Sequence, residues 1–351
     1  MNYFCSFINA TMAAALSVIV SVFSVPVHAT ETEAEVPLSE VCLEFAGNPD
    51  ADVGDIIRAD CKPTLAQMTD LMNNPLGNVA MLFTQWDQYR MENPLNGREA
   101  SQGNYMGIFQ FPKKLNKNWN LINRFVWNVP SAPLDQDKID DFNSGNVQGN
   151  YVNPNPAGGM PLPLDQFEGR TTGFGDFYYV GLFAPTVPTD VLNGKLVWGL
   201  GFDLGFPTAS EDILGSDAYS AGPSAIAAYL GPKWKVGALV QHYVDYAGAS
   251  DREDMNLTNL QYLWYYSINP TTSIGAAPNI IIDWEQNSDN QVTLPLGIGI
   301  NKTINIGKVP TRFGFEVFYP VIQPDDIVGT KWSYRLYVIP AAPSALFGWM
   351  Q

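Results

Sequence analysis

The chain contains long stretches in which apolar residues alternate with small or polar residues in strict period two. Between 196 and 206 every even position is apolar, and the odd positions are Val, Gly or Asp. The same alternation recurs at 292–301, 311–319 and 331–338. Successive side chains of a β-strand point to opposite faces. Each stretch therefore predicts a strand with one apolar face and one small or polar face.

Twelve strands follow from this pattern along the chain. They are predicted at 78–90, 103–112, 120–130, 173–184, 194–206, 223–230, 234–246, 257–268, 272–284, 292–301, 311–319 and 331–338. A tilted strand needs about 9–11 residues to cross a bilayer, whereas strands of globular proteins average about 5–6. The lengths favour an all-β fold: a transmembrane antiparallel up-and-down β-barrel of about twelve strands. A secreted β-sandwich is the less favoured alternative.

The connections between these strands differ at the two predicted ends of the barrel. Short turns rich in lysine, such as 113–119 and 231–233, alternate with longer acidic links, of which 131–171 is the longest. Short turns on the periplasmic side and long loops outside are typical of bacterial outer-membrane barrels. Tryptophans near strand ends are typical of the aromatic girdles of such barrels: Trp86, Trp119, Trp127, Trp234, Trp264, Trp284 and Trp332.

The first 75 residues of the chain predict export and a small helical segment. Residues 1–29 resemble a secretory signal peptide, with an apolar stretch at 12–25 and small residues before a cleavage point near Ala29. Residues 30–75 hold ten acids and two bases and form a predicted periplasmic segment. Thr64 and Gln67 match a capping box, which predicts a short helix up to Pro75. This segment is either a plug or a poorly ordered leader, followed by a barrel at 76–340 and an extension at 341–351.

Charge and cysteine content limit the function classes. The formal net charge of -16 argues against nucleic-acid binding, which requires Lys and Arg to replace counterions on phosphate. No cofactor motif is found: Gly173-Phe174-Gly175-Asp176 precedes a strand and lacks the third glycine of a nucleotide loop. Cys42 and Cys61 form a candidate disulfide, because an oxidising compartment permits one. Zinc binding is the alternative, but no histidine lies nearby.

The inward faces of the predicted strands supply the candidate functional residues. The candidate lumen-lining residues are Asp203, Lys235, Gln241, Asp245, Arg312, Glu316, Lys331 and Arg335, with Arg124, Asp176 and Asp283 less clearly assigned. Rings of charge select solutes by sign. The alternative is a polar interior that pairs with itself and closes the barrel. The width of the open bore depends on whether loop 131–171 or segment 30–75 folds inside the barrel.

After removal of the predicted signal peptide, His242 is the single histidine that could take part in catalysis. A barrel enzyme acting on envelope lipid through a Ser-His-acid arrangement would have to use it. The alternation places His242 on the predicted lipid face, and no Gly-x-Ser-x-Gly motif is present. We expect that the protein is not an enzyme.

Several short motifs carry a resemblance to a known family. They are the helix at 65–75, Trp119-Asn120-Leu121-Ile122-Asn123-Arg124, Gly173-Phe174-Gly175-Asp176, Phe206-Pro207-Thr208-Ala209, Leu214-Gly215-Ser216, Gly222-Pro223 and Ala247-Gly248. From about Leu65 to Pro340 the chain resembles bacterial outer-membrane β-barrel transporters related to the MetA-pathway phenol-degradation family, some members of which carry the label neuromedin U. The resemblance implies a barrel that passes small solutes, hydrophobic or aromatic compounds among them. Residues 341–351 depart from the family, whose barrels tend to end at the last strand.

Together these features predict a porin-like channel of the Gram-negative outer membrane for passive passage of small solutes. The expected partners are outer-membrane lipid and lipopolysaccharide, the barrel-assembly machinery and small-molecule solutes. The alternatives are the lipid enzyme and a closed structural or adhesive barrel.

Overall fold

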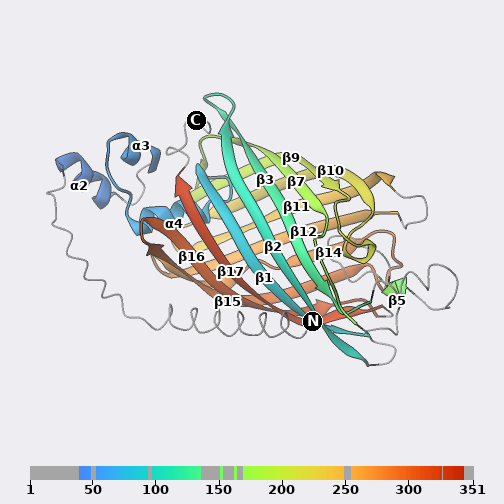
Figure 1. The fold of residues 1–351 in the computed structure, drawn as a ribbon. Coiled ribbons are helices and arrows are strands. Elements are labelled where there is room, and N and C mark those ends of the chain that lie inside the picture. The colour runs from blue at the N-terminus through green and yellow to red at the C-terminus, as the bar shows by residue number, and fades with distance from the viewer. Residues whose placement is uncertain are drawn as a thin grey trace.

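The computed structural model describes residues 39–48, 53–93, 97–135, 151–152, 162–163, 169–248, 254–325 and 327–343. The predicted signal peptide, most of loop 131–171 and residues 344–351 lie outside these ranges. The described chain forms a closed antiparallel β-barrel with a small helical segment at one end (Figure 1).

The wall of the barrel contains twelve strands, as the alternation predicts. In chain order they are β1 (Val79–Glu92), β2 (Glu99–Lys114), β3 (Trp119–Ala132), β7 (Phe177–Pro185), β9 (Gly194–Phe206), β10 (Ala218–Leu230), β11 (Trp234–Gly248), β12 (Asn256–Asn269), β13 (Thr272–Ala276) with β14 (Asn279–Asp283), β15 (Val292–Ile306), β16 (Val309–Ile322) and β17 (Gly329–Pro343). The halves β13 and β14 together form one strand of the wall.

Several short elements lie at the ends of the wall. Strand β6 (Thr171–Thr172) extends the pairing of β3, and β8 (Thr189–Val191) pairs with β9 in the turn that follows β7. Strands β4 (Tyr151–Val152) and β5 (Leu162–Pro163) pair with each other and, among the described residues, with no other strand, and a 3-10 turn spans Asp212–Leu214.

The first and last strands close the barrel. Strand β1 pairs with β17 from Val79↔Pro343 to Glu92↔Gly329, with one shift of register between Arg90 and Met91. The Thr84 hydroxyl donates to the carbonyl of Val338 across this pair, at 2.8 Å. Because β1 also pairs with β2, no edge of the wall is left open here.

The two faces of the wall differ as the alternation predicts. In β9 the side chains of Val197 and Asp203 are buried, whereas those of Leu200 and Phe202 are exposed. Other exposed apolar side chains on the strands include Val236, Leu296, Ile298, Val317 and Tyr319, and Trp119, Trp234, Trp284 and Trp332 are exposed at or beside strand ends. The barrel therefore presents apolar side chains outward, as expected of a wall that faces hydrocarbon.

The pairing of the strand formed by β13 and β14 is interrupted briefly toward β12 and over a longer stretch toward β15. Toward β12 its pairs continue in one register, with Trp264↔Ala276 before the break and Gln261↔Asn279 after it. Toward β15 the pairs stop at Ile274↔Ile300 and resume only at Ile281↔Thr293.

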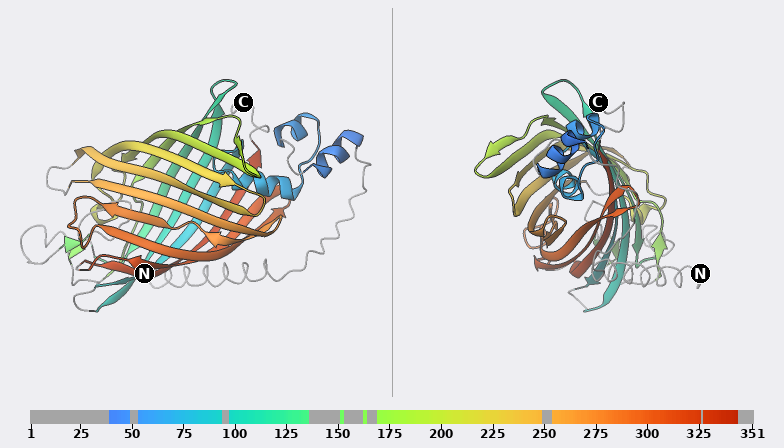
Figure 2. Two further views of the ribbon diagram at one scale, coloured as in Figure 1. Left: turned by 180° about the vertical axis from the view of Figure 1, so that it is seen from behind. Right: turned by 90° about the vertical axis from the view of Figure 1, so that its left-hand side faces the viewer.

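Three short helices, α2 (Glu40–Gly47), α3 (Val53–Arg58) and α4 (Leu65–Asn73), lie at the end of the barrel with the short turns (Figure 2). The capping box predicted for α4 is present, with the Thr64 side chain accepting from the Gln67 backbone and the Gln67 side chain accepting from the Thr64 backbone. The Gln67 amide also donates to the carbonyls of Phe45 and Asn48, both at 2.8 Å, at the C-terminal end of α2.

A disulfide joins the helical segment. Cys42 of α2 is bonded to Cys61, which follows α3, with their Cα atoms 5.5 Å apart. Over the residues that the structure describes, no helix is long and apolar enough to cross a membrane.

Candidate functional site

The segment from α4 to β1 lies across the short-turn mouth of the barrel. The Arg312 guanidinium of β16 donates to the Asn73 side chain at 2.8 Å and to the Thr69 carbonyl at 3.3 Å. From β2, the Gln110 amide donates to the carbonyl of Pro75 at 2.9 Å. Contacts from separate strands of the wall therefore hold this segment in the opening.

Leu76, near the C-terminal end of this segment, closes the lumen. Its side chain is 6% exposed and packs into a layer of inward-facing apolar side chains, namely Ile122, Val180, Leu182, Ala184, Val197, Ile226, Ala228 and Leu239. Beside it, Met72 of α4 packs with Met81 and Ile339. Close packing of this kind excludes water. We call the segment from Leu65 to Asn78 the plug.

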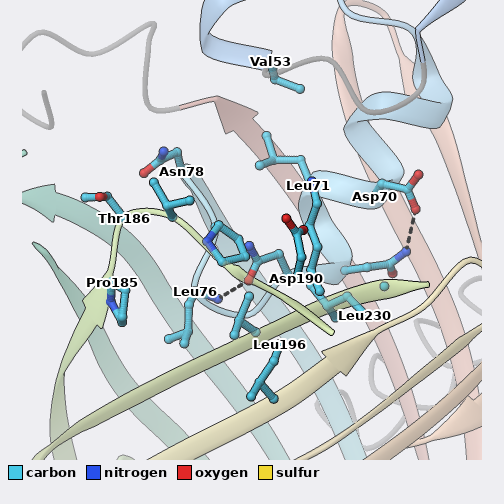
Figure 3. A pocket seen from close by; sticks show the side chains of 18 of the residues that line it. Val53, Asp70, Leu71, Leu76, Asn78, Pro185, Thr186, Asp190, Leu196 and Leu230 are labelled. Atoms are coloured by element: carbon cyan, nitrogen blue, oxygen red, sulfur yellow. Dashed lines mark hydrogen bonds between the residues drawn. The ribbon is translucent and has the colours of Figure 1, made fainter. Parts of the chain in front are cut away.

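A large cavity of about 1170 Å3 lies outside the plug, at the short-turn mouth. Figure 3 shows Leu76 and Leu230 on its inner side, with Asp70 of α4 and Asp190 of β8 around it. Lys235 also lines it, with its ammonium 3.9 Å from the Asp70 carboxylate and 2.8 Å from the Ser267 hydroxyl.

A second cavity of about 260 Å3 lies inside the barrel on the other side of the plug; we call it the inner cavity. Among the described residues none lines both cavities. The inner cavity reaches the long-loop end, where Asp283, Asn290 and Val328 line it. Its volume is just below the range of about 300–1,000 Å3 that is typical of small-molecule sites. The space is therefore large enough for one small molecule.

The first charged cluster of the inner cavity joins β1, β16 and β17. The Arg335 guanidinium lies 2.6 Å from the Asp87 carboxylate and 3.9 Å from that of Glu316, and sits over the Phe318 ring at 5.2 Å. Glu316 accepts from the hydroxyls of Tyr265 at 2.8 Å and Tyr337 at 3.3 Å. Buried charges of this kind persist when they are paired and hydrogen-bonded.

This cluster also binds the backbone at the break between β13 and β14. The N–H of Ala277 donates to Glu316, at 3.3 Å, and its carbonyl accepts from Arg335, at 3.1 Å. The charged residues therefore interact with the wall itself, so they are not simply a ring that lines an open bore.

The second polar cluster lies on β3, β9 and β11. The Gln241 amide donates to the Asp203 carboxylate at 3.2 Å and to the Tyr243 hydroxyl at 2.8 Å. Asp203 is fully buried, and one of its carboxylate oxygens has no partner among the described residues. Arg124, Gln241 and Tyr243 line the inner cavity, so this side of the lumen presents polar groups to a solute.

The structure brings most of the predicted lumen residues to the interior. Arg335, Gln241, Arg124 and Asp283 line the inner cavity, Asp203 and Glu316 lie behind its surface, Lys235 lines the mouth cavity, and Arg312 binds the plug. Asp245 instead accepts from the backbone N–H of Met255 at 2.8 Å, near the loop that joins β11 to β12.

Lys331 departs from the expected inward position. Its ammonium lies 2.8 Å from the Glu99 carboxylate and 3.2 Å from that of Glu92. Glu92 follows Met91, which lines the inner cavity, so Glu92 belongs to the opposite, outer face. The shift of register between Arg90 and Met91 passes over Lys331, and this bulge turns its side chain outward at the long-loop rim.

Asp176 is also not a lumen charge. Its carboxylate accepts from the backbone N–H groups of Thr208, Ala209 and Ser216, at 3.1, 3.2 and 2.6 Å, and from the Ser216 hydroxyl. It holds the link between β9 and β10. The Gly-Phe-Gly-Asp motif therefore serves a loop.

His242 lies on the outer face of β11, as predicted. Its Nδ1 is 2.9 Å from the Thr258 hydroxyl, which also accepts from the Trp284 indole at 2.9 Å. Within the ranges that the structure describes, no group of three or more His, Cys, Asp or Glu is placed to hold a metal ion.

Two features of the site were not among the predicted residues. Asp87 could have been found, because it is a charged residue on the inward face of the first predicted strand. Leu76 gives no such signal, since an apolar residue between a helix and a strand is common in any fold.

No protein-family model and no curated protein matches the chain. Among solved structures, the chain is similar to an outer membrane channel of Pseudomonas putida F1, with a TM-score of 0.49 and 13% identity over 75% of this chain and 94% of that one. It is also similar to outer membrane phospholipase A of Escherichia coli, with a TM-score of 0.40 and 9% identity over 80% and 98%. A third similar structure is a FadL homologue of Pseudomonas aeruginosa, with a TM-score of 0.34 and 9% identity over 76% of this chain and 90% of that one. TM-scores below 0.5 do not establish a common fold, so the architecture rests on this chain's own strand pairing.

Proposed function

We propose that the protein is an outer-membrane channel through which small solutes pass by diffusion, with the plug controlling its short-turn mouth. The observation that carries this proposal is the inner cavity. A closed barrel with an apolar outer face encloses a space for one small molecule, and polar groups from two clusters face that space. A purely structural barrel would have no need to keep this space open.

The plug supports a gated mechanism. It is held in the mouth by a few hydrogen bonds and two apolar clusters, one around Leu76 and one around Met72, without being part of the wall. Moving Leu76 out of its layer would join the two cavities into a continuous path. Solutes would then pass the charges of Arg335, Arg124 and Asp283, which favour or oppose them by sign.

The cellular setting belongs to the same proposal. Export through a signal peptide and insertion by the barrel-assembly machinery would place the apolar outer face in lipid, with lipopolysaccharide around the long-loop end. Hydrophobic or aromatic compounds are proposed among the solutes, in line with the resemblance to the phenol-degradation family.

We propose no catalytic role for the chain. The contact between Thr258 and His242 has the geometry of a hydroxyl and a base, but the Trp284 indole already donates to the same hydroxyl. Its place on the outer face of β11 fits an interfacial histidine.

Single-channel conductance in a planar bilayer tests the proposal. We expect full-length protein to show rare openings, and Leu76→Ala and a variant without residues 30–75 to show frequent ones. Leu192→Ala is the matched control, because Leu192 is 94% exposed in a turn at the rim of the mouth cavity and does not belong to the apolar layer around Leu76. Silence of all variants, from protein shown to be folded by heat-dependent gel mobility, would favour the closed barrel.

A further inference from the structure

The wall of the barrel is unpaired between β13–β14 and β15, in its middle. Over residues 254–325, which are described throughout, the ladder carries no pair between Gly275–Ile280 on one side and Leu294–Gly299 on the other. We call this interval the seam. In hydrocarbon every unpaired backbone group is costly, so membrane barrels pair all of their strands. The seam is therefore a feature that needs a reason.

The seam does not arise from an inserted residue. The pairs on its two sides share one register, so the strands separate and rejoin without slipping. Proline at 278 and 295 removes an N–H from each side, and proline is otherwise confined to edges of sheets. Gly275, with φ of +154°, begins the departure in a conformation that favours glycine. The local sequence therefore favours separation at this point.

Side chains from three other strands hold the separated strand inward. Glu316 of β16 accepts from the Ala277 N–H, and Arg335 of β17 donates to the Ala277 carbonyl. The Gln261 amide of β12 donates to the same carbonyl at 3.4 Å. A buried ion-pair cluster is a costly way to fix one backbone residue, and here it holds Ala277 out of the ladder with β15, while the Ala276 side chain still lies close to Gly297 across the seam.

The seam has the inner cavity on one side and an apolar outer face on the other. Pro278, Asn279 and Pro295 line the inner cavity. Leu296 and Ile298, on the outer face of β15, are 54% and 60% exposed. The Tyr262 hydroxyl donates to the Pro295 carbonyl at 2.7 Å and so crosses the seam. Tyr262 pairs with Ala238, on the outward-facing side of β11, so this bond lies on the outer surface.

We infer that the seam is a lateral portal through which apolar, membrane-soluble small molecules move between the inner cavity and the hydrocarbon of the bilayer, with Tyr262 as its latch. The Leu76 layer closes the short-turn end of the lumen, so a solute that enters from the long-loop end reaches the seam first. A polar solute would stay in the lumen, because the outer face of the wall beside the portal is apolar. This inference rests on the proposed channel function and adds the class of solute and its exit.

A reversible cross-link tests the portal. Ile280 and Leu294 would face each other in the shared register, both on the outer side, next to the pair Ile281↔Thr293. We would make Ile280→Cys with Leu294→Cys in the full chain and close the pair by oxidation or with a short bismaleimide, verifying closure by a gel shift. The probe is 1-N-phenylnaphthylamine, an apolar dye that fluoresces in lipid and that lipopolysaccharide excludes from intact cells.

We expect cells with the wild-type protein to take up the dye faster than cells without it. Dye uptake by cells with the cross-linked pair should fall to the rate of cells without the protein. Reductant should restore the wild-type rate in samples that were closed by oxidation. Wild type treated with reductant controls for the Cys42–Cys61 disulfide. Tyr262→Phe removes the latch bond and should speed uptake, whereas Tyr266→Phe, whose ring packs on Trp234, should not change it.

Two results would overturn the portal: dye uptake at the wild-type rate through the closed pair, or no faster uptake by wild-type cells than by cells without the protein. Conductance is recorded on the same variants and is expected to be unchanged by closure. A protein that conducts but fails the dye test therefore loses only the portal, whereas one that does neither also loses the proposed function.

Discussion

Arg335 and Asp87 lie directly opposite each other on β17 and β1, the two strands that close the barrel, and their side chains form an ion pair of 2.6 Å inside it. The exposed fractions of these side chains are 12% and 3%. The pair therefore links barrel closure to the charged cluster at the seam.

Removing one member of this pair should destabilise the barrel strongly. Asp87→Asn leaves Arg335 with Glu316 as its nearest carboxylate, and breaking a buried ion pair costs about 3–5 kcal/mol. Urea unfolding of the folded barrel in lipid vesicles measures the loss. Glu92→Gln is the control, because its pair with Lys331 is partly exposed at the rim and such pairs contribute about 0–1 kcal/mol. Equal effects of the two substitutions would contradict the role given to the buried pair.

The disulfide should stabilise the helical segment and leave the plug in place. The chain-entropy model gives about 3 kcal/mol for a loop of this size. In Cys42→Ser we expect fast hydrogen exchange in α2, while α4 stays protected through its contacts with Arg312 and through the bond from Gln110 to Pro75 just after the helix. Cys61→Ser should match it. Unchanged exchange in α2 would show that the Gln67 contacts are sufficient alone.

Substitution of Asp176 should destabilise the link between β9 and β10 and leave the lumen unaffected. Asp176→Ala leaves the backbone N–H groups of Thr208, Ala209 and Ser216 without their acceptor, and each lost bond to a charged group costs about 1.5–3 kcal/mol. We expect proteolytic cleavage between 207 and 217, with conductance unchanged. Asp190→Ala, at an exposed turn, should resist cleavage there. An altered ion selectivity of the Asp176→Ala variant would contradict this assignment and show that Asp176 acts as a lumen charge.

His242 should be dispensable for lipid turnover. His242→Ala removes the contact with Thr258 on the outer face and should leave phospholipid composition of expressing cells as it is with wild type. Thr258→Val provides a second variant of the same contact. Lipid hydrolysis that is present in wild type and absent from both variants would establish the enzyme alternative.

The strands could be predicted because one physical rule governs a wall with lipid outside and side chains inside. The alternation in β9 survives in the structure residue by residue, from Val197 to Gly205. The helix α4 was predictable for a local reason, since Thr64 and Gln67 satisfy each other's backbone within one turn.

The seam could not be predicted from alternation, because its two sides keep one register. Residues 272–284 therefore appear as one strand, with Pro278 as the only signal against it. The inward position predicted for Lys331 was wrong because here the register does shift. A bulge depends on how β1 and β17 meet, and the two strands are far apart in sequence. The plug depends on contacts between α4 and distant strands, which no local pattern encodes.

The pairing of β1 with β17 has a consequence for how the molecule is made. The first strand to leave the ribosome waits for the last, because Thr84 and Val338, 254 positions apart, must meet before the wall is sealed. The plug immediately precedes β1, so it is anchored beside that final joint. Its contacts come from β2, from β16 and from the apolar layer of β3 to β11, so the plug can reach its final position only when these strands have assembled around it.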